Sequence, residues 1–326
     1  MKIRESAEIR TFDPASVVKC TVPAEDVTRV KGLGCLRDKT TADCFNVRVI
    51  TVNGKLTSEK LAAAAEAAKR FGSGEVAMTA RLTLEIQSVP YANIEPLREF
   101  LAQHGLESGG TGPKVRPVVS CKGTTCQYGL IDTFGLSEKI HELYYVGYHN
   151  VKLPHKFKIG VGGCPNNCVK PSLNDVGIVG QRVPVLDMDL CKGCKTCQPE
   201  KACPVHCISM ENDNDKMVMD SDACINCGRC VGKCPFHVID RYITGYRVYL
   251  GGRWGKNYAH GIPMETLFTD EQEVLSIVEK TILLFKDKGI AGERLSDTIE
   301  RIGFDEACRI LESNELMERK DEILSK

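Results

Sequence analysis

The chain has 326 residues, of which 42% are apolar and 26% charged, ordinary values for a globular protein of two or three domains. Its 43 basic and 43 acidic side chains cancel, which excludes a general attraction to nucleic acid or to an anionic membrane. The first residues, MKIRESAEIRTF, lack the apolar core of a signal peptide, and the sequence has no run of about 20 apolar residues to span a bilayer. We therefore expect a cytoplasmic protein that binds neither nucleic acid nor a membrane.

Seventeen cysteines are the outlying feature of the composition, and most stand in tight CxxC-type groups. Disulfides are typical of small secreted chains, whereas this chain is long and shows no export signal. The spacing therefore favours thiolates that bind metal in a reducing compartment.

The N-terminal part alternates strand and helix patterns. Residues 44–52 predict a strand that ends at the Asn53-Gly54 turn, and the following Ala-rich helix has Thr57 as its N-cap and ends before Gly72. Two further strands and a second helix are predicted at 74–80, 82–89 and 93–104. This β-α-β-β-α order is that of a ferredoxin-like α+β unit.

A Gly-rich linker, 106–114, leads to a second α/β region. The pattern predicts strands at 115–121, 156–163 and 246–252, a helix around 134–144, and a late helix that begins with a capping box at Thr269 and ends before Gly289. We expect an α+β fold with three domains: a ferredoxin-like domain (1–112), a catalytic α/β domain (113–186 and 240–326) and an inserted cysteine-rich module (187–239).

Two cysteine groups in that module share the C-x2-C-x2-C…C-Pro arrangement of bacterial two-cluster ferredoxins, the first with a slightly longer last spacer. In this arrangement the fourth cysteine of each group binds the other cluster. The crossed pattern predicts one [4Fe–4S] cluster on Cys191, Cys194, Cys197 and Cys234, and a second on Cys224, Cys227, Cys230 and Cys203.

Zinc is the rival interpretation, because it also uses CxxC pairs, but two triplets that each lead to Cys-Pro fit it poorly. Cys207 is left over once the ligand count is complete, and we expect a buried thiol there.

Two more cysteine pairs, Cys121 with Cys126 and Cys164 with Cys168, are separated by most of an α/β unit. Both follow predicted strands, so their loops can converge on one site. Gly162 and Gly163 allow close backbone approach to a bulky cofactor. The spacing predicts a third four-thiolate cluster.

The run LPHKFKIGVGGCPNNC (153–168) resembles the centre of the sirohaem-dependent sulfite and nitrite reductase family. The chain is similar, over roughly residues 44–260, to the small anaerobic sulfite reductase branch of that family, which carries an inserted ferredoxin domain. The resemblance implies that Cys121, Cys126, Cys164 and Cys168 hold a [4Fe–4S] cluster and that Cys168 also bridges to the sirohaem iron. CKGTTC has four residues between its cysteines where the family usually has five, which bears on the fine geometry of the site.

Sulfite is an anion and sirohaem carries carboxylates, so the site needs local positive charge. Lys156 and Lys158 alternate along a predicted strand and point to one face, a pattern that by itself is typical of a solvated strand. The resemblance implies that both lysines bind substrate and supply protons and that Arg116 contacts the anion. It also implies that Arg81 pairs with sirohaem carboxylates. Arg48 is the candidate for a further substrate arginine, with a solvent-facing strand residue as the alternative.

Several other residues receive no catalytic role. His155 is expected to face away from the lysines, and Trp254 either lines the cofactor or packs in the protein. The remaining cysteines have no partners at ligand spacing and are expected to be ordinary thiols: Cys20, Cys35, Cys44 and Cys308.

The resemblance implies a six-electron reduction of sulfite to sulfide that uses sirohaem and three [4Fe–4S] clusters, because no side chain holds the electrons. The expected partners are an electron-donor protein or redox subunits, and the chain is expected to pair with itself or with them. Two alternatives stay open: a sirohaem nitrite reductase that makes ammonia, and an electron-transfer protein with clusters but no sirohaem.

Overall fold

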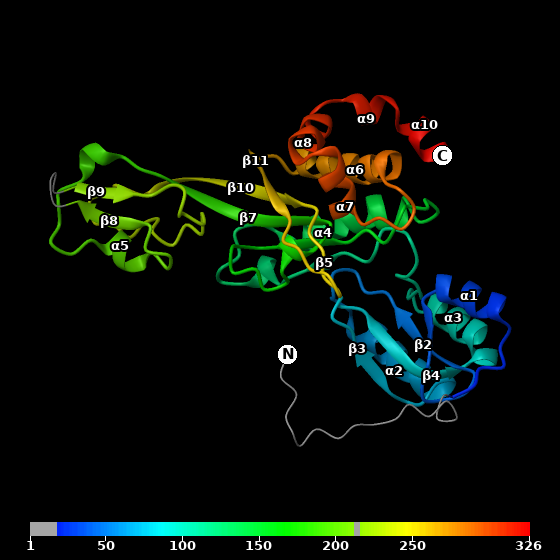
Figure 1. Ribbon diagram of the computed structural model, residues 1–326. Coiled ribbons are helices and arrows are strands. Elements are labelled where there is room, and N and C mark those ends of the chain that lie inside the picture. The colour runs from blue at the N-terminus through cyan, green and yellow to red at the C-terminus, as the bar shows by residue number, and fades with distance from the viewer. Residues whose placement is uncertain (1–17, 212–215) are drawn as a thin grey trace, which may run out of the picture. The chain divides into compact units, whose positions relative to one another are not determined.

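The computed structural model describes residues 18–211 and 216–326 (Figure 1). The N-terminal residues in which we looked for a signal peptide lie outside this range. The chain divides into two compact units: residues up to Ile50 with Leu56–Thr111, and Thr51–Lys55 with Gly112–Lys326. Within the described ranges, no helix has both the length and the apolar character needed to cross a membrane.

The first unit is a four-stranded antiparallel sheet in the order β1-β2-β4-β3, accompanied by three α-helices. The strands are β1 (Cys35–Arg37), β2 (Cys44–Val49), β3 (Val76–Met78) and β4 (Leu84–Pro90). The helices are α1 (Ala24–Gly32), α2 (Ser58–Phe71) and α3 (Ile94–Gln103), with a 3-10 turn at Tyr91–Asn93. The predicted β-α-β-β-α order is present, from β2 to α3.

Local sequence features explain why helix α2 forms and where it packs. The Thr57 side chain accepts the Lys60 N–H at 3.3 Å and so satisfies one of the free amides of the first turn. One face of the helix then buries small side chains that let it lie close to the sheet: Ala63, Ala64, Ala67 and Ala68. Their burial with apolar residues of β2, β4 and α3 makes the core of the unit.

The second unit is built on a five-stranded mixed sheet in the order β11-β10-β7-β6-β5. Its strands are β5 (Val119–Ser120), β6 (Ile159–Gly162), β7 (Val176–Val185), β10 (Arg241–Leu250) and β11 (Ile262–Phe268). Strands β5, β6 and β7 are parallel, whereas β10 is antiparallel to both β7 and β11. Strands β7 and β10 pair along their whole length and run out to the cysteine-rich segment (Figure 1).

That segment contains only short elements: η6 (Met188–Leu190), α5 (Gln198–Ala202), and the antiparallel pair β8 (Ile208–Glu211) and β9 (Lys216–Met219). Half of the residues in its buried cluster are cysteines, and the other half are apolar side chains: Ile208, Met217, Val238 and Ile239. The small apolar core fits a segment in which another component supplies much of the stability.

Most of the remaining helices of the second unit precede β6 or follow β11 in the chain. One 3-10 turn, η5 (Pro171–Leu173), lies between β6 and β7. The others are η3 (Gly123–Thr125), α4 (Thr133–Ile140) with a π-helical turn (His141–Val146), α6 (Glu271–Lys288), α7 (Leu295–Ile302), α8 (Phe304–Glu312), α9 (Glu315–Glu318) and α10 (Lys320–Ser325). Helix α6 buries the predicted apolar stripe, including Val274, Val278, Ile282 and Phe285.

Several predicted boundaries were wrong. The strand expected at 156–163 begins at Ile159, and the strand expected at 115–121 is only Val119–Ser120, because β5 pairs with β6 over just two residues. The strand expected from 246 begins at Arg241, since β10 follows β7 outward. The N-cap of α6 is Asp270 rather than Thr269, because the Asp270 carboxylate accepts the Gln272 N–H at 2.6 Å.

Candidate functional site

The loops that carry the first two cysteine pairs meet at one edge of the sheet. Cys121 follows β5 and Cys164 follows β6, and the carboxyl ends of parallel neighbours lie at the same edge. The Gly163 N–H donates to Cys121 Sγ at 3.1 Å, so the second loop touches the first cysteine directly. The sheet therefore brings together two pairs that stand about 40 positions apart in the sequence.

Two glycines make this approach possible. A Cβ added at Gly163 would lie 2.8 Å from the Gly123 Cα, and one added at Gly123 would lie 2.8 Å from the Gly163 Cα. Only a pair of glycines tolerates that distance. The freedom of Gly163, expected to serve a cofactor, is thus used in the structure for contact between the two loops.

All four thiols of the two pairs lie near enough to affect one another's charge. Burial raises the pKa of Cys164, and the neighbouring Cys121, Cys168 and Cys126 raise it further. Among the described residues, no three His, Cys, Asp or Glu side chains stand as the ligands of a single metal ion would. A cubane asks for a wider arrangement because each thiolate binds a different iron, and four neighbouring thiols on two loops fit that requirement.

A second group of four predicted ligands lines one pocket in the cysteine-rich segment: Cys203, Cys224, Cys227 and Cys230. Apolar side chains such as Pro184, Val205 and Ile225 complete the wall. Burial raises the pKa of Cys230 to about 11, and charge on the other three thiols adds to the shift. Cys207 lines the pocket as well, and a wall of cysteines and apolar side chains fits a [4Fe–4S] cluster.

The third group of predicted ligands combines the first triplet of the cysteine-rich segment with Cys234. Burial raises the pKa of Cys197, and Cys234 and Cys191 are among the nearby charges that raise it further. Cys234 therefore lies near the first triplet although it follows the second in the sequence. Cys194 joins this group by its place in the motif.

Cys203 and Cys207 compete for one ligand position, because their sulfurs lie 3.4 Å apart. Although burial would raise the pKa of Cys203, backbone N–H groups of Val205, Cys207 and Ile208 lower it overall. Burial and the bond with Cys203 raise the pKa of Cys207 to about 12. The backbone thus stabilises a thiolate at Cys203 and keeps a thiol at Cys207.

Positive charge gathers around Lys156, which is half-buried just before β6. Burial lowers the pKa of Lys156, and the charges of Arg294, Arg116 and Arg253 lower it further. The Arg116 N–H donates to the Phe157 carbonyl at 2.8 Å, which fixes the arginine beside the lysine segment. A lysine whose charge is disfavoured by surrounding cations is suited to bind an anion.

Two hydrogen bonds fix the backbone of Lys158. Its N–H donates to Asp175 Oδ2 at 2.8 Å, and its carbonyl accepts the Val176 N–H at 3.0 Å. Phe157 and Ile159, on either side, are fully buried, whereas Lys156 and Lys158 are half-buried. The lysines therefore alternate with core residues as predicted, although the segment is an extended lead-in to β6 rather than part of the strand.

The other two predicted arginines belong to the first unit. Arg48 pairs with Glu85 across β2 and β4, with 3.4 Å between Nη2 and Oε2, and its Nη1 donates to the Gly110 carbonyl. It is therefore not the solvent-facing strand residue that was the alternative. Arg81 lies in the turn between β3 and β4, where its N–H donates to the Thr79 hydroxyl.

Residues outside these groups are placed as follows. His155 accepts the Lys156 N–H at Nδ1, and burial lowers its pKa, as do Lys156 and nearby arginines. Trp254 is 58% exposed, so it is not a core residue, and the Lys170 ammonium lies 5.8 Å from its ring centroid. The remaining cysteines form no disulfide: Cys20, Cys35, Cys44 and Cys308.

Sequence reasoning missed three residues of the cationic cluster: Asp175, Arg253 and Arg294. Asp175 directly precedes β7, and Arg253 follows β10, so each stands where a strand meets a loop. Polar residues at such positions are often functional, so their place in the sequence could have indicated them. Arg294 begins α7 far along the chain, and only the fold brings it to Asp175.

Comparison with known proteins gives two family matches that together cover most of the chain. The profile "Nitrite and sulphite reductase 4Fe-4S domain" matches residues 111–320, and the profile "Nitrite/Sulfite reductase ferredoxin-like half domain" matches residues 37–104. The predicted ferredoxin-like character of the first unit is thereby confirmed.

Among curated relatives, an uncharacterized protein of Methanocaldococcus jannaschii is 30% identical over 81% of this chain and 89% of its own length. The coenzyme F420-dependent sulfite reductase of the same organism is 28% identical over 76% of this chain. A subunit of the anaerobic sulfite reductase of Salmonella typhimurium is 32% identical over 62% of this chain. The matches span 38% of the F420-dependent enzyme and 63% of the Salmonella protein.

Among solved structures, dissimilatory sulfite reductase I has a TM-score of 0.65 at 20% identity, covering 82% of this chain and 69% of that one. The NirA protein of Mycobacterium tuberculosis has a TM-score of 0.58 at 20% identity, covering 84% and 41%. At this identity the likeness is one of fold.

Proposed function

The chain belongs to the nitrite and sulphite reductase family, and on that premise we propose that it reduces sulfite to sulfide. The observation that carries the proposal is the half-buried Lys156 among Arg116, Arg253 and Arg294. The same unit gathers the four thiols that follow β5 and β6. An electron carrier has no need of an anion site, and a sulfite reductase needs both features.

Sirohaem and iron–sulfur clusters would relay the electrons of an external donor and provide the iron chemistry for the reduction of sulfite. The residues that fit a cluster beside the haem are Cys121, Cys126, Cys164 and Cys168, with Cys168 as the bridging thiolate. The thiol grouping and the two-glycine contact support this assignment. The exposed position of Cys168 leaves its sulfur accessible to a macrocycle.

Arg116, Lys156 and Lys158 then act on the substrate. Their charges stabilise the oxygens of sulfite and the negative charge that develops as electrons arrive. Because burial and neighbouring cations lower its pKa, Lys156 gives up a proton more readily than a solvated lysine and is suited to release an oxygen as water. Arg48 and Arg81 are proposed, by resemblance alone, to act on substrate and on sirohaem carboxylates.

We further propose that residues 187–239 form an inserted module with two [4Fe–4S] clusters, giving three in all. The pocket lined by Cys203, Cys224, Cys227 and Cys230, and the nearness of Cys234 to Cys197, support the crossed ligand sets. An external donor protein or partner redox subunits would deliver electrons to this module. The Salmonella relative is named as one subunit of its enzyme, which is consistent with such partners.

The experiment is anaerobic purification of the full chain, followed by absorption spectroscopy and steady-state assays with sulfite and nitrite. Sirohaem bands with a higher kcat/KM for sulfite support the proposal. A higher kcat/KM for nitrite would replace it with the alternative that the family description also covers. Clusters without a macrocycle would leave an electron-transfer protein.

A further inference from the structure

One pocket lies between two of the predicted cluster sites. Its wall includes Cys164, which we assign to the cluster beside the haem, and Cys227, which we assign to a ferredoxin-type cluster. None of Cys191, Cys194, Cys197 and Cys234 is among the described residues that line it. The cluster on Cys203, Cys224, Cys227 and Cys230 is therefore the one adjacent to the haem-side cluster.

Two arginines on this wall, Arg182 of β7 and Arg229 of the Cys227 loop, connect that loop to its neighbours. The Arg182 N–H donates to the Asn226 carbonyl at 2.7 Å, and Arg182 forms an isolated bridge with Cys227. From the other side, the Arg229 guanidinium lies 5.7 Å from the ring centroid of Tyr128, two residues after Cys126. Arg229 itself stands between Cys227 and Cys230 in the sequence.

The fit around Arg182 is close. Gly228 has φ +64°, and an added Cβ would lie 2.4 Å from the Arg182 Cδ. The Arg182 guanidinium lies 4.6 Å from the ring centroid of Tyr242, and its Nε is buried with no hydrogen-bond partner within the described ranges. The side chain is thus packed against the Cys227 loop by its aliphatic part and covered by an aromatic ring.

Neither arginine is neutralised by a carboxylate from the part of the chain that the structure describes. Two net positive charges therefore face a pocket that borders two predicted clusters. Positive charge beside a cluster favours its reduced, more negative state, and net charge is one of the factors that set cluster potentials. The effect is stronger for a half-buried charge than for an exposed one, because water and salt screen the latter.

We propose that Arg182 and Arg229 raise the reduction potential of the cluster held by Cys203, Cys224, Cys227 and Cys230. Their charges act on this cluster from the pocket wall, and Arg229 also holds the Cys227 loop next to Tyr128. This rests on the proposed function, since it requires the clusters assigned above.

The test is a redox titration followed by paramagnetic resonance, on the anaerobically isolated full chain reduced with dithionite. In Arg182→Gln, the ratio of reduced to oxidised cluster at a fixed solution potential falls about tenfold, equivalent to about 59 mV for one electron. Arg229→Gln shifts the ratio in the same direction by less, because Arg229 is exposed, and its shift shrinks at high salt. Arg182→Lys keeps the charge and retains the wild-type potential.

Arg309→Gln is the matched control, since it removes one exposed arginine from α8, where Arg309 pairs with Glu306, and leaves the potential unchanged. Equal shifts in Arg182→Gln and Arg182→Lys, or unchanged potentials in both glutamine variants, would overturn the inference. If Arg182→Gln loses iron, the potentials of Arg229→Gln and Arg182→Lys still test the inference. Wild-type protein without iron and acid-labile sulfide would overturn the proposed function as well.

Discussion

Arg294 and Asp175 form an ion pair in the interior of the second unit. The Arg294 Nη2 donates to both carboxylate oxygens of Asp175, at 2.9 and 2.8 Å, and the two side chains are 8% and 0% exposed. Burial raises the pKa of Asp175, while the charge and hydrogen bonds of Arg294 oppose that rise. The same carboxylate accepts the Lys158 N–H, so the pair fixes the segment that carries both site lysines.

Asp175→Asn should therefore destabilise the fold strongly. The change leaves the buried Arg294 charge without its partner, and breaking a buried pair from one side typically costs about 3–5 kcal/mol. Denaturant unfolding measures this loss of stability. Glu306→Gln, which breaks an exposed pair in α8, is the control and should cost at most about 1 kcal/mol. Equal effects in the two variants would show that the Arg294 pair does not anchor the unit.

Lys158→Met tests the assignment of the site lysines. We expect intact cofactor absorbance and a fall in kcat of about 10²–10³-fold, because a charge that stabilises the transition state is lost while the backbone contacts to Asp175 and Val176 remain. Lys152→Met, at an exposed lysine of the same segment, should leave kcat unchanged. Parallel loss of sirohaem and activity would make Lys158 a cofactor-binding residue instead.

The lowered pKa of Lys156 predicts a pH effect. Burial and the nearby arginines favour the neutral amine, so the protonated form is lost, as pH rises, below the ordinary lysine value of 10.5. The kcat/KM for sulfite should fall along an alkaline limb that lies below that value. Lys156→Arg should move the limb upward, because a guanidinium does not deprotonate in this range. A limb that stays in place in Lys156→Arg would assign it to another group.

The roles of Cys203 and Cys207, which stand four residues apart, can be tested with a pair of alanine variants. Cys203→Ala should lose the iron of one cluster, since the backbone stabilises a thiolate at Cys203. Cys207→Ala should keep all the iron and lose only a buried thiol. Iron analysis and paramagnetic resonance of the two proteins decide between them. Iron loss confined to Cys207→Ala would exchange the two roles.

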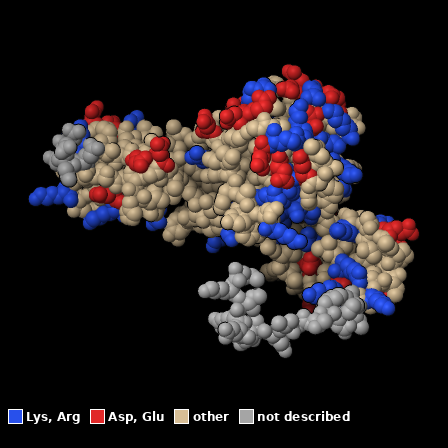
Figure 2. Space-filling view, viewed as in Figure 1, with Lys and Arg blue, Asp and Glu red and all other residues tan. Residues whose placement is uncertain are grey.

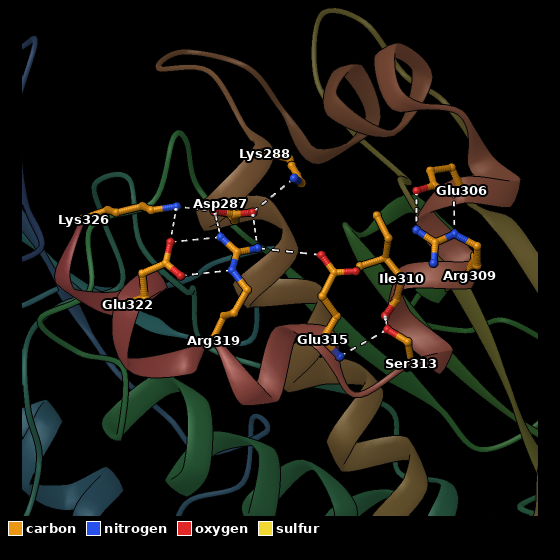
Figure 3. Close-up of polar contacts among 10 residues, drawn as sticks. All are labelled: Asp287, Lys288, Glu306, Arg309, Ile310, Ser313, Glu315, Arg319, Glu322 and Lys326. Atoms are coloured by element: carbon orange, nitrogen blue, oxygen red, sulfur yellow. Dashed lines mark hydrogen bonds and ion pairs between the residues drawn. The ribbon is translucent and has the colours of Figure 1, made fainter.

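The C-terminal helices are tied to α6 through Asp287 (Figure 3). Arg319 and Lys326 both contact this carboxylate, and the face of α8 to α10 carries acidic and basic side chains side by side (Figure 2). Although burial would raise the pKa of Asp287, the bond from Lys326 and the charges of Arg319 and Lys288 lower it overall.

A lowered carboxyl pKa contributes stability above the unfolded value, near 3.8, and that contribution is lost as pH falls through the folded value. Asp287→Asn should therefore lower the free energy of unfolding by about 1.5–3 kcal/mol at neutral pH, the range for hydrogen bonds to charged groups. The difference from wild type should shrink below about pH 4. A difference that is independent of pH would mean that packing rather than charge is lost.

The sequence by itself determined the local chemistry of this protein. Cysteine spacing predicts the crossed ligand sets, since the motif is short and its geometry is local. The N-cap at Thr57 and the apolar stripe of α6 likewise depend on neighbours a few residues away. The ends of β5 and β10 could not be predicted in this way, because strand length follows from pairing with distant partners.

Only the tertiary structure decided which distant groups share a site. It brings Arg294 to Asp175 across 119 positions, and it places Arg182 of β7 against the Cys227 loop. It also packs Gly163 against Gly123 and so joins two loops. The physical reason is that burial and charge depend on every neighbour in space, and a chain of zero net charge gives no sign of where its cations gather until it folds.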